Sequence, residues 1–375
     1  MSLSYTAVIS KDKNDIEWDD FVASVPGAHF EQTTGWAVAN EMRGWTTWRF
    51  YLKSGNVIAA GFQVAFLSYP LAGKIGLVTQ GPVARNEDEE LLHVLIEETK
   101  LFLKENGFLY VAFVVPYKQE KTAKILKTEG LSVRPFGLPP TAVVEDTLFL
   151  DLKKEKQELW RDISQSRRRN IKKGLKQNFN FHEGSRDDLK TFHHLMLTMC
   201  DRRNTEPTHK NVEFFYRLWD NLAAQGWFKL FLLEYENSVT CALVGFSIGD
   251  TFRYWKWGWN GDHQEMNFPS VMIWKTIEWA KDNGFRYFDF VQVDREVAEA
   301  VKGHKQLTDD LLNKSFAGPT LFKVRYGGEL VSTPGIYIMF RNAFVRTLIM
   351  NVVVKLLNSK LLTKLMGFVR HLSIR

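Results

Sequence analysis

The part of the sequence best suited to bind an anion is a basic run near its middle. Between Arg161 and Lys176, seven of the sixteen residues are positively charged and only Asp162 is acidic. The seven are Arg161, Arg167, Arg168, Arg169, Lys172, Lys173 and Lys176. Arginine offers a planar fork that can bond two oxygens of a phosphate or carboxylate at once. The run therefore predicts a bound anion, with Arg167, Arg168 and Lys172 as substrate-binding residues. A solvated basic helix face is the alternative.

A second candidate group lies in the segment from Phe322 to Gly328. Aromatic and charged residues alternate there as on a β-strand, which would place Lys323 and Arg325 on one face. An ammonium group on such a face could stabilise negative charge that develops on an acyl carbonyl oxygen. Lys323 is therefore a candidate catalytic residue and Phe322 a candidate substrate contact. The alternative is a surface lysine on an edge strand.

A third candidate is the predicted helix start at Asn267-Phe268-Pro269-Ser270. Proline is comfortable in the first turn of a helix, and the N–H groups there attract anions. Pro269 and Ser270 are therefore candidates for binding an acyl donor, with an ordinary helix start as an equally good interpretation. No glycine-rich pyrophosphate loop precedes this helix, which disfavours a standard acetyl-CoA site.

The remaining titratable side chains give weaker signals. Asp289 could act as a general base and Tyr254 could line a site, although a carboxylate at the end of a strand more often caps a helix or pairs with an arginine. The nine histidines show no metal-ligand spacing, and neither Cys200 nor Cys241 has a nearby histidine that would suggest a nucleophile. We therefore expect no metal and no cofactor, and removal of a proton by water or by the substrate stays open.

These side chains need a scaffold, and an internal repeat predicts one. Residues 104–113 read KENGFLYVAF and residues 281–290 read KDNGFRYFDF, with six of ten positions identical. Each copy follows an amphipathic helical pattern, and its Asn-Gly would end the helix before a buried strand. We expect two copies of one domain, with Leu109–Phe113 and Arg286–Phe290 at equivalent positions. The copies differ in chemistry because Ala112 in the first is Asp289 in the second.

Length and composition fit two globular lobes. The chain has 375 residues, of which 45% are hydrophobic and 25% charged. Strands that alternate with helices and hairpins predict an α/β (α+β) fold, in which each lobe is a mixed, mostly antiparallel sheet flanked by helices. We expect the first lobe over residues 1–150 and the second, catalytic lobe over residues 151–335. A basic helix is expected from near Lys154 to Lys176.

The C-terminal segment, residues 336–375, contains seven basic residues and no acidic residue. Its apolar residues recur at helical spacing, so we expect a basic amphipathic helical tail that contacts a membrane surface; packing on the second lobe is the alternative. No run of about 20 apolar residues could span a membrane, and the polar N-terminus is not a signal peptide. With only two cysteines, these features predict a cytoplasmic protein that can lie at the inner face of the membrane.

Over about residues 15–335 the sequence resembles the Fem-type (FemABX) aminoacyltransferases, a family within the GNAT superfamily of acyl-CoA N-acyltransferases. The resemblance rests on the order and spacing of short pieces: His29-Phe30-Glu31-Gln32 with Trp36, Gly81-Pro82-Val83, Ser166 to Lys173, Phe214-Phe215 with Leu218, Pro269 to Asp289, and Phe322-Lys323. Family members have two GNAT-like lobes. They transfer an amino acid from aminoacyl-tRNA to an amine of a peptidoglycan precursor, with no metal and no covalent enzyme intermediate. The resemblance thus implies two GNAT-like lobes, Lys323 near the reacting carbonyl, and a basic helix that helps to hold the acceptor.

The sequence departs from the family pattern in three places. Val291-Gln292 stands where a glycine pair often follows the aspartate, and Asn40 stands where some members carry an acceptor-binding lysine four residues after the tryptophan. A long coiled-coil insertion is also missing. We therefore expect an N-acyltransferase, with Trp36 among its substrate contacts, that acylates an amine of a cell-envelope precursor from aminoacyl-tRNA or acyl-CoA. The alternatives are an acyl-CoA-dependent enzyme for an amino sugar in polysaccharide biosynthesis and a non-catalytic binder of tRNA or an anionic polymer.

Overall fold

The computed structural model of the chain describes residues 5–70, 72–85, 88–135, 138, 143–314 and 316–354. The chain divides into two compact units, each assembled from separate segments. Unit 1 contains Met1–Val25, Arg43–Val143 and Thr333–Arg375, and unit 2 contains Pro26–Met42 and Val144–Ser332. The lobes expected from the sequence were continuous. The units differ from them because a segment near the N-terminus belongs to unit 2 and the segment after Ser332 belongs to unit 1.

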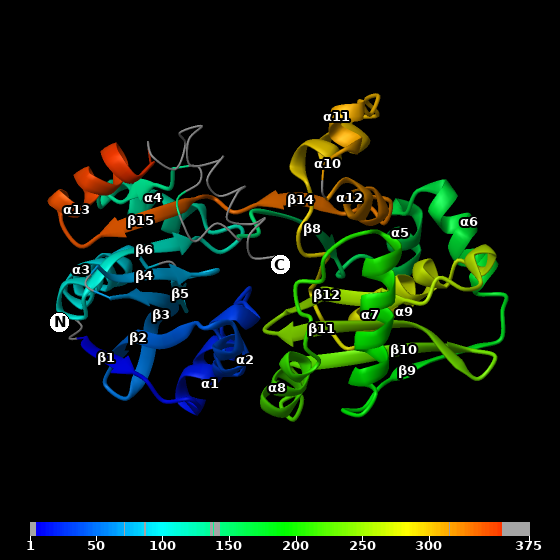
Figure 1. The fold of residues 1–375 in the computed structure, drawn as a ribbon, viewed down its shortest axis with the longest axis horizontal. Coiled ribbons are helices and arrows are strands. Elements are labelled where there is room, and N and C mark those ends of the chain that lie inside the picture. The colour runs from blue at the N-terminus through cyan, green and yellow to red at the C-terminus, as the bar shows by residue number, and fades with distance from the viewer. Residues whose placement is uncertain are drawn as a thin grey trace, which may run out of the picture. The chain divides into compact units, whose positions relative to one another are not determined.

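Unit 1 is built on a sheet with the strand order β1-β2-β3-β4-β6-β15-β7, in which the short β5 pairs with β3 (Figure 1). The strands are β1 (Thr6–Ser10), β2 (Thr46–Ser54), β3 (Val57–Tyr69), β4 (Gly73–Val78), β5 (Val83–Ala84), β6 (Phe108–Val114), β7 (Ser132–Val133) and β15 (Ile336–Phe340). Its helices are α1 (Ile16–Ser24), α3 (Glu89–Glu105), α4 (Glu120–Thr128) and α13 (Ala343–Leu348), which a π-helical turn, Ile349–Val353, continues.

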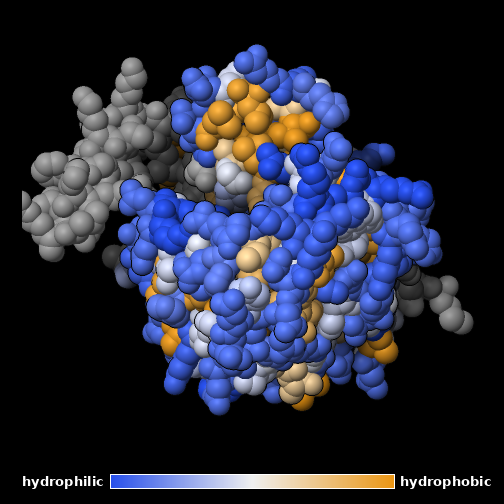
Figure 2. Space-filling view, turned by 90° about the vertical axis from the view of Figure 1, so that its right-hand side faces the viewer, coloured by the Kyte–Doolittle hydropathy of each residue, from blue (hydrophilic) through white to orange (hydrophobic). Residues whose placement is uncertain are grey.

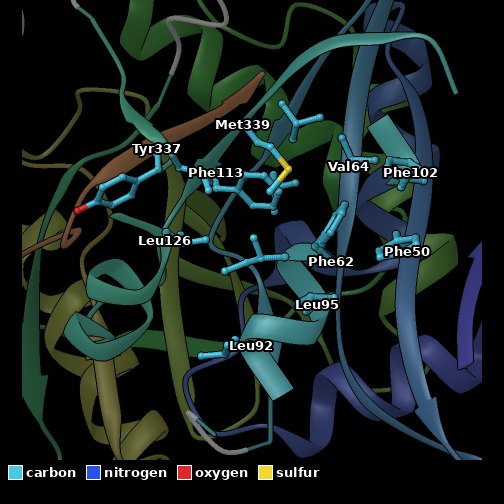
Figure 3. Packing of buried hydrophobic residues seen from close by; sticks show 14 of the residues in the cluster. Phe50, Phe62, Val64, Leu92, Leu95, Phe102, Phe113, Leu126, Tyr337 and Met339 are labelled. Atoms are coloured by element: carbon cyan, nitrogen blue, oxygen red, sulfur yellow. The ribbon is translucent and has the colours of Figure 1, made fainter. Parts of the chain in front are cut away.

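The two faces of this sheet bury different side chains, because successive residues of a strand point to opposite faces. On β6, Val111 and Phe113 lie in the main core with residues of α3 and α4 (Figure 3). Tyr110 and Ala112 lie in a second cluster with Val345 of α13. Both faces of β6 are therefore covered, and hydrophobic burial holds the helices against the sheet.

Unit 2 has a sheet with the order β9-β10-β11-β12-β13-β8-β14. The strands are β8 (Asp146–Asp151), β9 (Phe179–Glu183), β10 (Phe228–Tyr235), β11 (Ser238–Ile248), β12 (Thr251–Trp259), β13 (Tyr287–Asp289) and β14 (Glu329–Ser332). The helices are α2 (Thr34–Asn40), α5 (Lys156–Asp162), α6 (Gln165–Gly174), α7 (Leu189–Arg202), α8 (Glu213–Leu222), α9 (Phe268–Asp282), α10 (Arg295–Lys302), α11 (Asp309–Leu312) and α12 (Ala317–Val324). Helices α7 and α9 cover opposite faces of this sheet (Figure 1).

The two sheets have one topology, as the repeat predicted. Strands β6 and β13, which carry the repeated sequence, are each fifth in their sheet. Each pairs in parallel with the fourth strand, β4 or β12, and antiparallel with the sixth, β15 or β8. The predicted equivalence of Leu109–Phe113 and Arg286–Phe290 is confirmed.

The sixth strand of each sheet is exchanged between the units. Strand β8 follows β7 along the chain but pairs with β13 and β14 in unit 2. Strand β15 follows β14 but pairs with β6 and β7 in unit 1. This corrects the prediction that the tail is helical from residue 336, because residues 336–339 are buried and apolar on both faces, as an internal strand requires.

One predicted strand and one predicted helix also need correction. Phe322 to Gly328 is not a strand, because Phe322 and Lys323 lie on α12, whose buried residues Ala317, Thr320 and Val324 have helical spacing. The expected face shared by Lys323 and Arg325 therefore does not exist. The basic helix expected from Lys154 to Lys176 is two helices, since Ile163 and Ser164 have extended backbone between α5 and α6.

The described part of the C-terminal tail ends at Val354. It includes helix α13, Arg341 and Arg346. The other five basic residues of the predicted tail lie outside the described residues: Lys355, Lys360, Lys364, Arg370 and Arg375. Within residues 5–354, apart from the gaps, no helix combines the length and the apolar composition needed to cross a bilayer.

Candidate active site

Strand β12 of unit 2 has an edge that its neighbour leaves unpaired. It pairs with β11 along its length but with β13 only through residues 251–253. Beyond Arg253, no strand among the described residues pairs with this edge. The register with β11 steps from Lys256 to Tyr254, so Trp255 is an extra residue and β12 bulges there. Bulges of this kind redirect side chains beside active sites.

Asp289, at the end of β13, is a buried carboxylate within an ion pair. Its Oδ2 lies 3.6 Å from Nε of Arg253 on β12, and both side chains are no more than 2% exposed. Its Oδ1 accepts hydrogen bonds from the hydroxyl of Thr147 and, at 2.8 Å, from the N–H of Val291. Burial raises the pKa of Asp289, while Arg253 opposes that shift. All these partners are protein groups, and a general-base role for Asp289 stays a prediction.

Lys323 reaches from α12 to the turn that follows Asp289. Its Nζ donates to the carbonyl oxygens of Val291 at 2.7 Å and Gln292 at 2.8 Å, and lies 5.6 Å from the ring centre of Tyr254. Burial lowers the pKa of Lys323 to about 7, assisted by Lys256 and opposed by Asp289. An ammonium group has three N–H donors, so two are engaged by the turn and one remains for another acceptor.

Arg167 holds helix α12, which carries Lys323, against the start of α9. Its Nη1 donates to the Ser270 hydroxyl at 2.7 Å and its Nη2 to the Phe322 carbonyl at 3.4 Å. The guanidinium lies 4.2 Å from the ring centre of Phe322 and 5.3 Å from that of Tyr326. Its pKa is lowered by burial. The contacts make Arg167 a link between α6, α9 and α12, and its predicted role in substrate binding stays a prediction.

The start of α9 offers fewer donors than the sequence suggested. Pro269 has no N–H, and the N–H groups of Ser270 and Val271 donate to the carbonyl of Asn267 at 2.9 and 3.3 Å. The Ser270 carbonyl also accepts from the Tyr326 hydroxyl at 3.2 Å. The contact of this end with α6 is close, because a Cβ at Gly174 would lie 2.4 Å from Val271. Donor binding by Pro269 and Ser270 stays a prediction.

The basic residues of α6 fall into two groups. Arg168 is half-buried and donates to the carbonyls of Trp160, Arg161 and Ile163 at 2.6–3.3 Å, so it caps the end of α5. Three others on α6, and Lys176 just after it, are exposed and have no acidic partner in the part of the chain that the structure describes; the three are Arg169, Lys172 and Lys173. The face of unit 2 seen in Figure 2 is largely hydrophilic, with a hydrophobic patch near its top. Lys172 is exposed, and its predicted role in substrate binding stays a prediction, as does that of Arg168.

Trp36 lies in an aromatic cluster of unit 2, apart from the contacts of Lys323. Its ring centre is 4.9 Å from that of Phe30, 5.7 Å from Trp255 and 6.0 Å from Phe214. The buried Asn40, where some relatives carry a lysine, donates to the Trp36 carbonyl at 3.1 Å. These contacts attach helix α2 to unit 2, and substrate binding by Trp36 stays a prediction.

The structure adds residues to this site that sequence reasoning missed. Arg253 and Thr147 bind the carboxylate of Asp289, and Trp257 stacks on Phe322 with ring centres 5.6 Å apart. Val291 and Gln292 supply the carbonyls that bind Lys323. The only signal in the sequence was the missing glycine pair. In the described residues, no group of three or more histidine, cysteine, aspartate or glutamate side chains could hold a metal.

Comparison with known proteins finds a domain model and relatives that match this chain. The model of a GNAT acetyltransferase domain, Acetyltransf_6, matches residues 161–302. The lipid II:glycine glycyltransferases of Staphylococcus aureus (strain MRSA252) and Staphylococcus epidermidis (strain RP62A) are each 24% identical, over 61% and 58% of this chain. The chain spans only 55% and 54% of the length of these relatives.

Two solved structures share this fold. A crystal structure of FemX matches with a TM-score of 0.76 and 17% identity, covering 90% of this chain and 97% of FemX. The structure of L-PGS from Bacillus licheniformis matches with a TM-score of 0.54 and 13% identity, covering 93% of this chain and 98% of L-PGS. Together, the glycyltransferase relatives, the GNAT domain match over residues 161–302 and the FemX-like fold show that the chain is similar to the FemABX-like members of the GNAT superfamily.

Proposed function

We propose that the protein is an N-acyltransferase that moves an aminoacyl group from an activated ester to a primary amine of a cell-envelope precursor. The observation that carries this proposal is the ammonium of Lys323, which has two donors bound to the Val291–Gln292 turn and one donor left. That donor lies beside Tyr254, at the unpaired edge of β12. The glycyltransferase relatives, whose name couples glycine to lipid II, support this class of reaction.

In the proposed reaction, the acceptor amine attacks the carbonyl carbon of the donor ester. The new C–N bond moves an electron pair onto the carbonyl oxygen, and the remaining N–H of Lys323 stabilises this oxyanion. Collapse of the intermediate breaks the ester bond, and the leaving oxygen takes the proton that the amine loses. Alignment of amine and ester at near-attack distance supplies much of the remaining rate enhancement.

Between the two donor classes, the start of α9 favours an aminoacyl ester over an acyl-CoA. In GNAT acyltransferases a pyrophosphate sits at such a helix start. Here Pro269 has no N–H, and the next two N–H groups are bound to Asn267. We infer that the phosphates of the substrate instead lie along the exposed cations of α6 and of the residue Lys176 that follows it. Arg169, Lys172, Lys173 and Lys176 form this surface, and none has an acidic partner among the described residues.

Substitution of Lys323 tests the proposal. Lys323→Met removes the donor and should lower turnover about 10²- to 10³-fold, as loss of an oxyanion donor does in other acyl transfers. Lys305→Met is the control, since Lys305 is an exposed lysine of unit 2 that lies between α10 and α12. Turnover is followed by the mass increase of the acceptor with a panel of aminoacyl-tRNAs and acyl-CoAs. Unchanged turnover in Lys323→Met would reject its catalytic role.

The donor is identified separately by thermal stability, since a ligand that binds only the folded state raises the melting temperature. An aminoacyl-tRNA should protect both the natural protein and Lys323→Met, whereas acyl-CoA should protect neither. Protection by tRNA without turnover of any acceptor would favour the non-catalytic binder instead.

We also propose a peripheral contact with the membrane through the C-terminal part of unit 1. Phe344 is 75% exposed, and Leu348 and Val352 are each 46% exposed, at intervals of one helical turn. No acidic residue occurs between Thr333 and Val354, and Arg341 and Arg346 are basic. An apolar stripe with basic neighbours is typical of helices that lie on anionic membranes.

Flotation with anionic vesicles at low salt tests this contact. The triple substitution Phe344→Ser, Leu348→Ser, Val352→Ser should reduce the floating fraction, whereas Val57→Ser, another exposed apolar position in unit 1, should not. A truncation must end after Val354, because ending the chain at Gly335 would remove β15 from the sheet of unit 1. Equal flotation of the triple variant and the natural protein would reject the contact.

A further inference from the structure

The turn between β13 and α10 has a backbone conformation that its residues do not favour. Val291 has a φ of 49° and Gln292 a φ of 37°. Left-handed backbone is unfavourable for residues with a Cβ, and most of all for β-branched residues such as valine. Glycine, which often stands here in the family, would adopt the same φ values without strain. The turn therefore needs outside support to persist.

That support comes from two side chains of the candidate site. Asp289 accepts the N–H of Val291 at 2.8 Å, and Lys323 donates to the carbonyls of both turn residues at 2.7 and 2.8 Å. Bonds from a charged ammonium are stronger than those between neutral groups. Lys323 is 31 and 32 positions away from its two acceptors in the sequence, so the support comes from a separate helix.

We propose that Lys323 and the Val291–Gln292 turn position each other. The ammonium of Lys323 binds the two carbonyl oxygens of the left-handed turn. In return, these two bonds fix the orientation of the ammonium, and so the direction of its third N–H group. Val291 and Gln292 are then positioning residues. What the third N–H meets depends on the proposed function, whereas the mutual support of lysine and turn does not.

A thermodynamic cycle tests the mutual support without a substrate. In the natural protein the turn is held in its strained form, so Val291→Gly with Gln292→Gly should relieve strain and raise the melting temperature by about 3 °C. In a Lys323→Met background the turn loses both carbonyl bonds and keeps only the bond to Asp289, so the same glycine pair should give a smaller gain. The difference between the two gains is the coupling between lysine and turn.

The chain offers a matched control in the same unit. Glu236 and Asn237, in the turn between β10 and β11, are also consecutive non-glycine residues with positive φ, 50° and 61°. The hairpin itself requires these values, because two-residue hairpin turns favour left-handed backbone. Glu236→Gly with Asn237→Gly should therefore change the melting temperature equally in the natural background and in the Lys323→Met background.

A second measurement tests positioning. With Lys323 intact, the glycine pair at 291 and 292 should lower kcat about fivefold and leave KM unchanged, because a looser turn directs the ammonium less well. The pair at 236 and 237 should leave both constants unchanged. If Lys323→Met does not fold, Lys323→Gln, which keeps one N–H donor group, replaces it in the cycle. Equal gains from the 291–292 pair in both backgrounds, or an unchanged kcat, would overturn the proposal.

Discussion

The same position in the two sheets carries opposite chemistry. In unit 1, Ala112 of β6 lies opposite Leu77 of β4, and both belong to apolar packing. In unit 2, Asp289 of β13 lies opposite Arg253 of β12, and the two form a buried ion pair. Burying charges costs several kcal/mol unless they are paired and hydrogen-bonded. The common backbone plan therefore does not require these charges, which occur at this position in unit 2 and not in unit 1.

The comparison extends to the strands themselves. Strands β4 and β6 pair as far as Val78 and Phe113, whereas β12 and β13 part after Arg253 and Asp289. In unit 2 the chain then enters the left-handed turn at Val291, which Asp289 and Lys323 support. The ion pair is thus placed where β12 and β13 part, one residue pair earlier than β4 and β6 part in unit 1.

Replacement of the ion pair by its counterpart from unit 1 should have the largest effect. Asp289→Ala removes the carboxylate from a buried arginine and should lower the free energy of unfolding by about 3–5 kcal/mol. The double variant Asp289→Ala, Arg253→Leu copies the contact of unit 1 and should recover most of this loss. Urea unfolding of the three proteins measures both steps. A double variant no more stable than Asp289→Ala would show that the two sheets are not interchangeable here.

The reverse substitution should be smaller but still large. Ala112→Asp buries a carboxylate opposite Leu77 and Ile338, with no cation at that position of the sheet, and should cost about 2–4 kcal/mol at pH 8. The loss should shrink at pH 5, because a buried carboxylate that binds a proton loses its charge. Ala112→Ser, of similar size to alanine, is the control. A tolerated Ala112→Asp at pH 8 would contradict the dry, apolar surroundings of Ala112.

Turnover should fall about tenfold for each pH unit above about 7, because the ammonium of Lys323 in unit 2 then loses its proton. Burial lowers its pKa to about 7 from the usual 10.5. The protonated form has the third N–H, so turnover should fall as the pH rises through about 7. The folded state binds fewer protons than the unfolded state between about 7 and 10.5, so the contribution of Lys323 to stability should rise over that interval.

Lys323→Arg is the comparison for this prediction, since a guanidinium stays charged throughout. The ratio of natural to variant turnover should fall above pH 7. The titration of the acceptor amine affects both proteins equally and therefore cancels in this ratio. The stability difference needs no substrate and is read from urea unfolding at pH 7 and pH 9. A ratio that stays constant from pH 6 to 9 would contradict the loss of the Lys323 proton in this pH range.

The smallest effects should come from the basic surface of unit 2. Lys172→Ala should weaken binding of the phosphate-bearing substrate about two- to fivefold at low salt and less at high salt, since the charge is exposed. Arg168→Ala should instead lower stability by about 1 kcal/mol, because it loses bonds that cap α5. Filter binding at two salt concentrations and thermal unfolding distinguish the two. If Arg168→Ala gives the salt-dependent loss and Lys172→Ala does not, the assignment of the two residues is reversed.

The features that the sequence predicted well are those encoded locally. The Asn-Gly ends of α3 and α9 and the apolar strands after them lie within ten residues, and their repetition predicted the shared topology. The spacing of residues in a short segment was a less reliable guide to whether it forms a strand or a helix. Seven residues from Phe322 fitted a strand alternation, but the helical spacing of Ala317, Thr320 and Val324 appears only in a longer window.

The features that were missed depend on contacts between distant parts of the chain. Arg253 meets Asp289 only through the register of β12 and β13, and Lys323 meets Val291 only after α12 packs on unit 2. Within the basic run, sequence could not separate Arg167 and Arg168, which bind protein groups, from the exposed Lys172. Lys323 was proposed from a strand alternation and from family resemblance; the strand was wrong, and the catalytic role of Lys323 stays a prediction.

The exchanged strands set the order in which the protein can be completed during synthesis. Strand β15, residues 336–340, lies between β6 and β7, so the sheet of unit 1 keeps a gap until those residues leave the ribosome. The strands of unit 2 are all present by Ser332. The half of the protein that is translated first is therefore the last to close, and until then it exposes two strand edges that could pair with other chains. A ribosome that stops shortly before codon 336 would release a chain with a complete sheet in unit 2 and an unfinished sheet in unit 1.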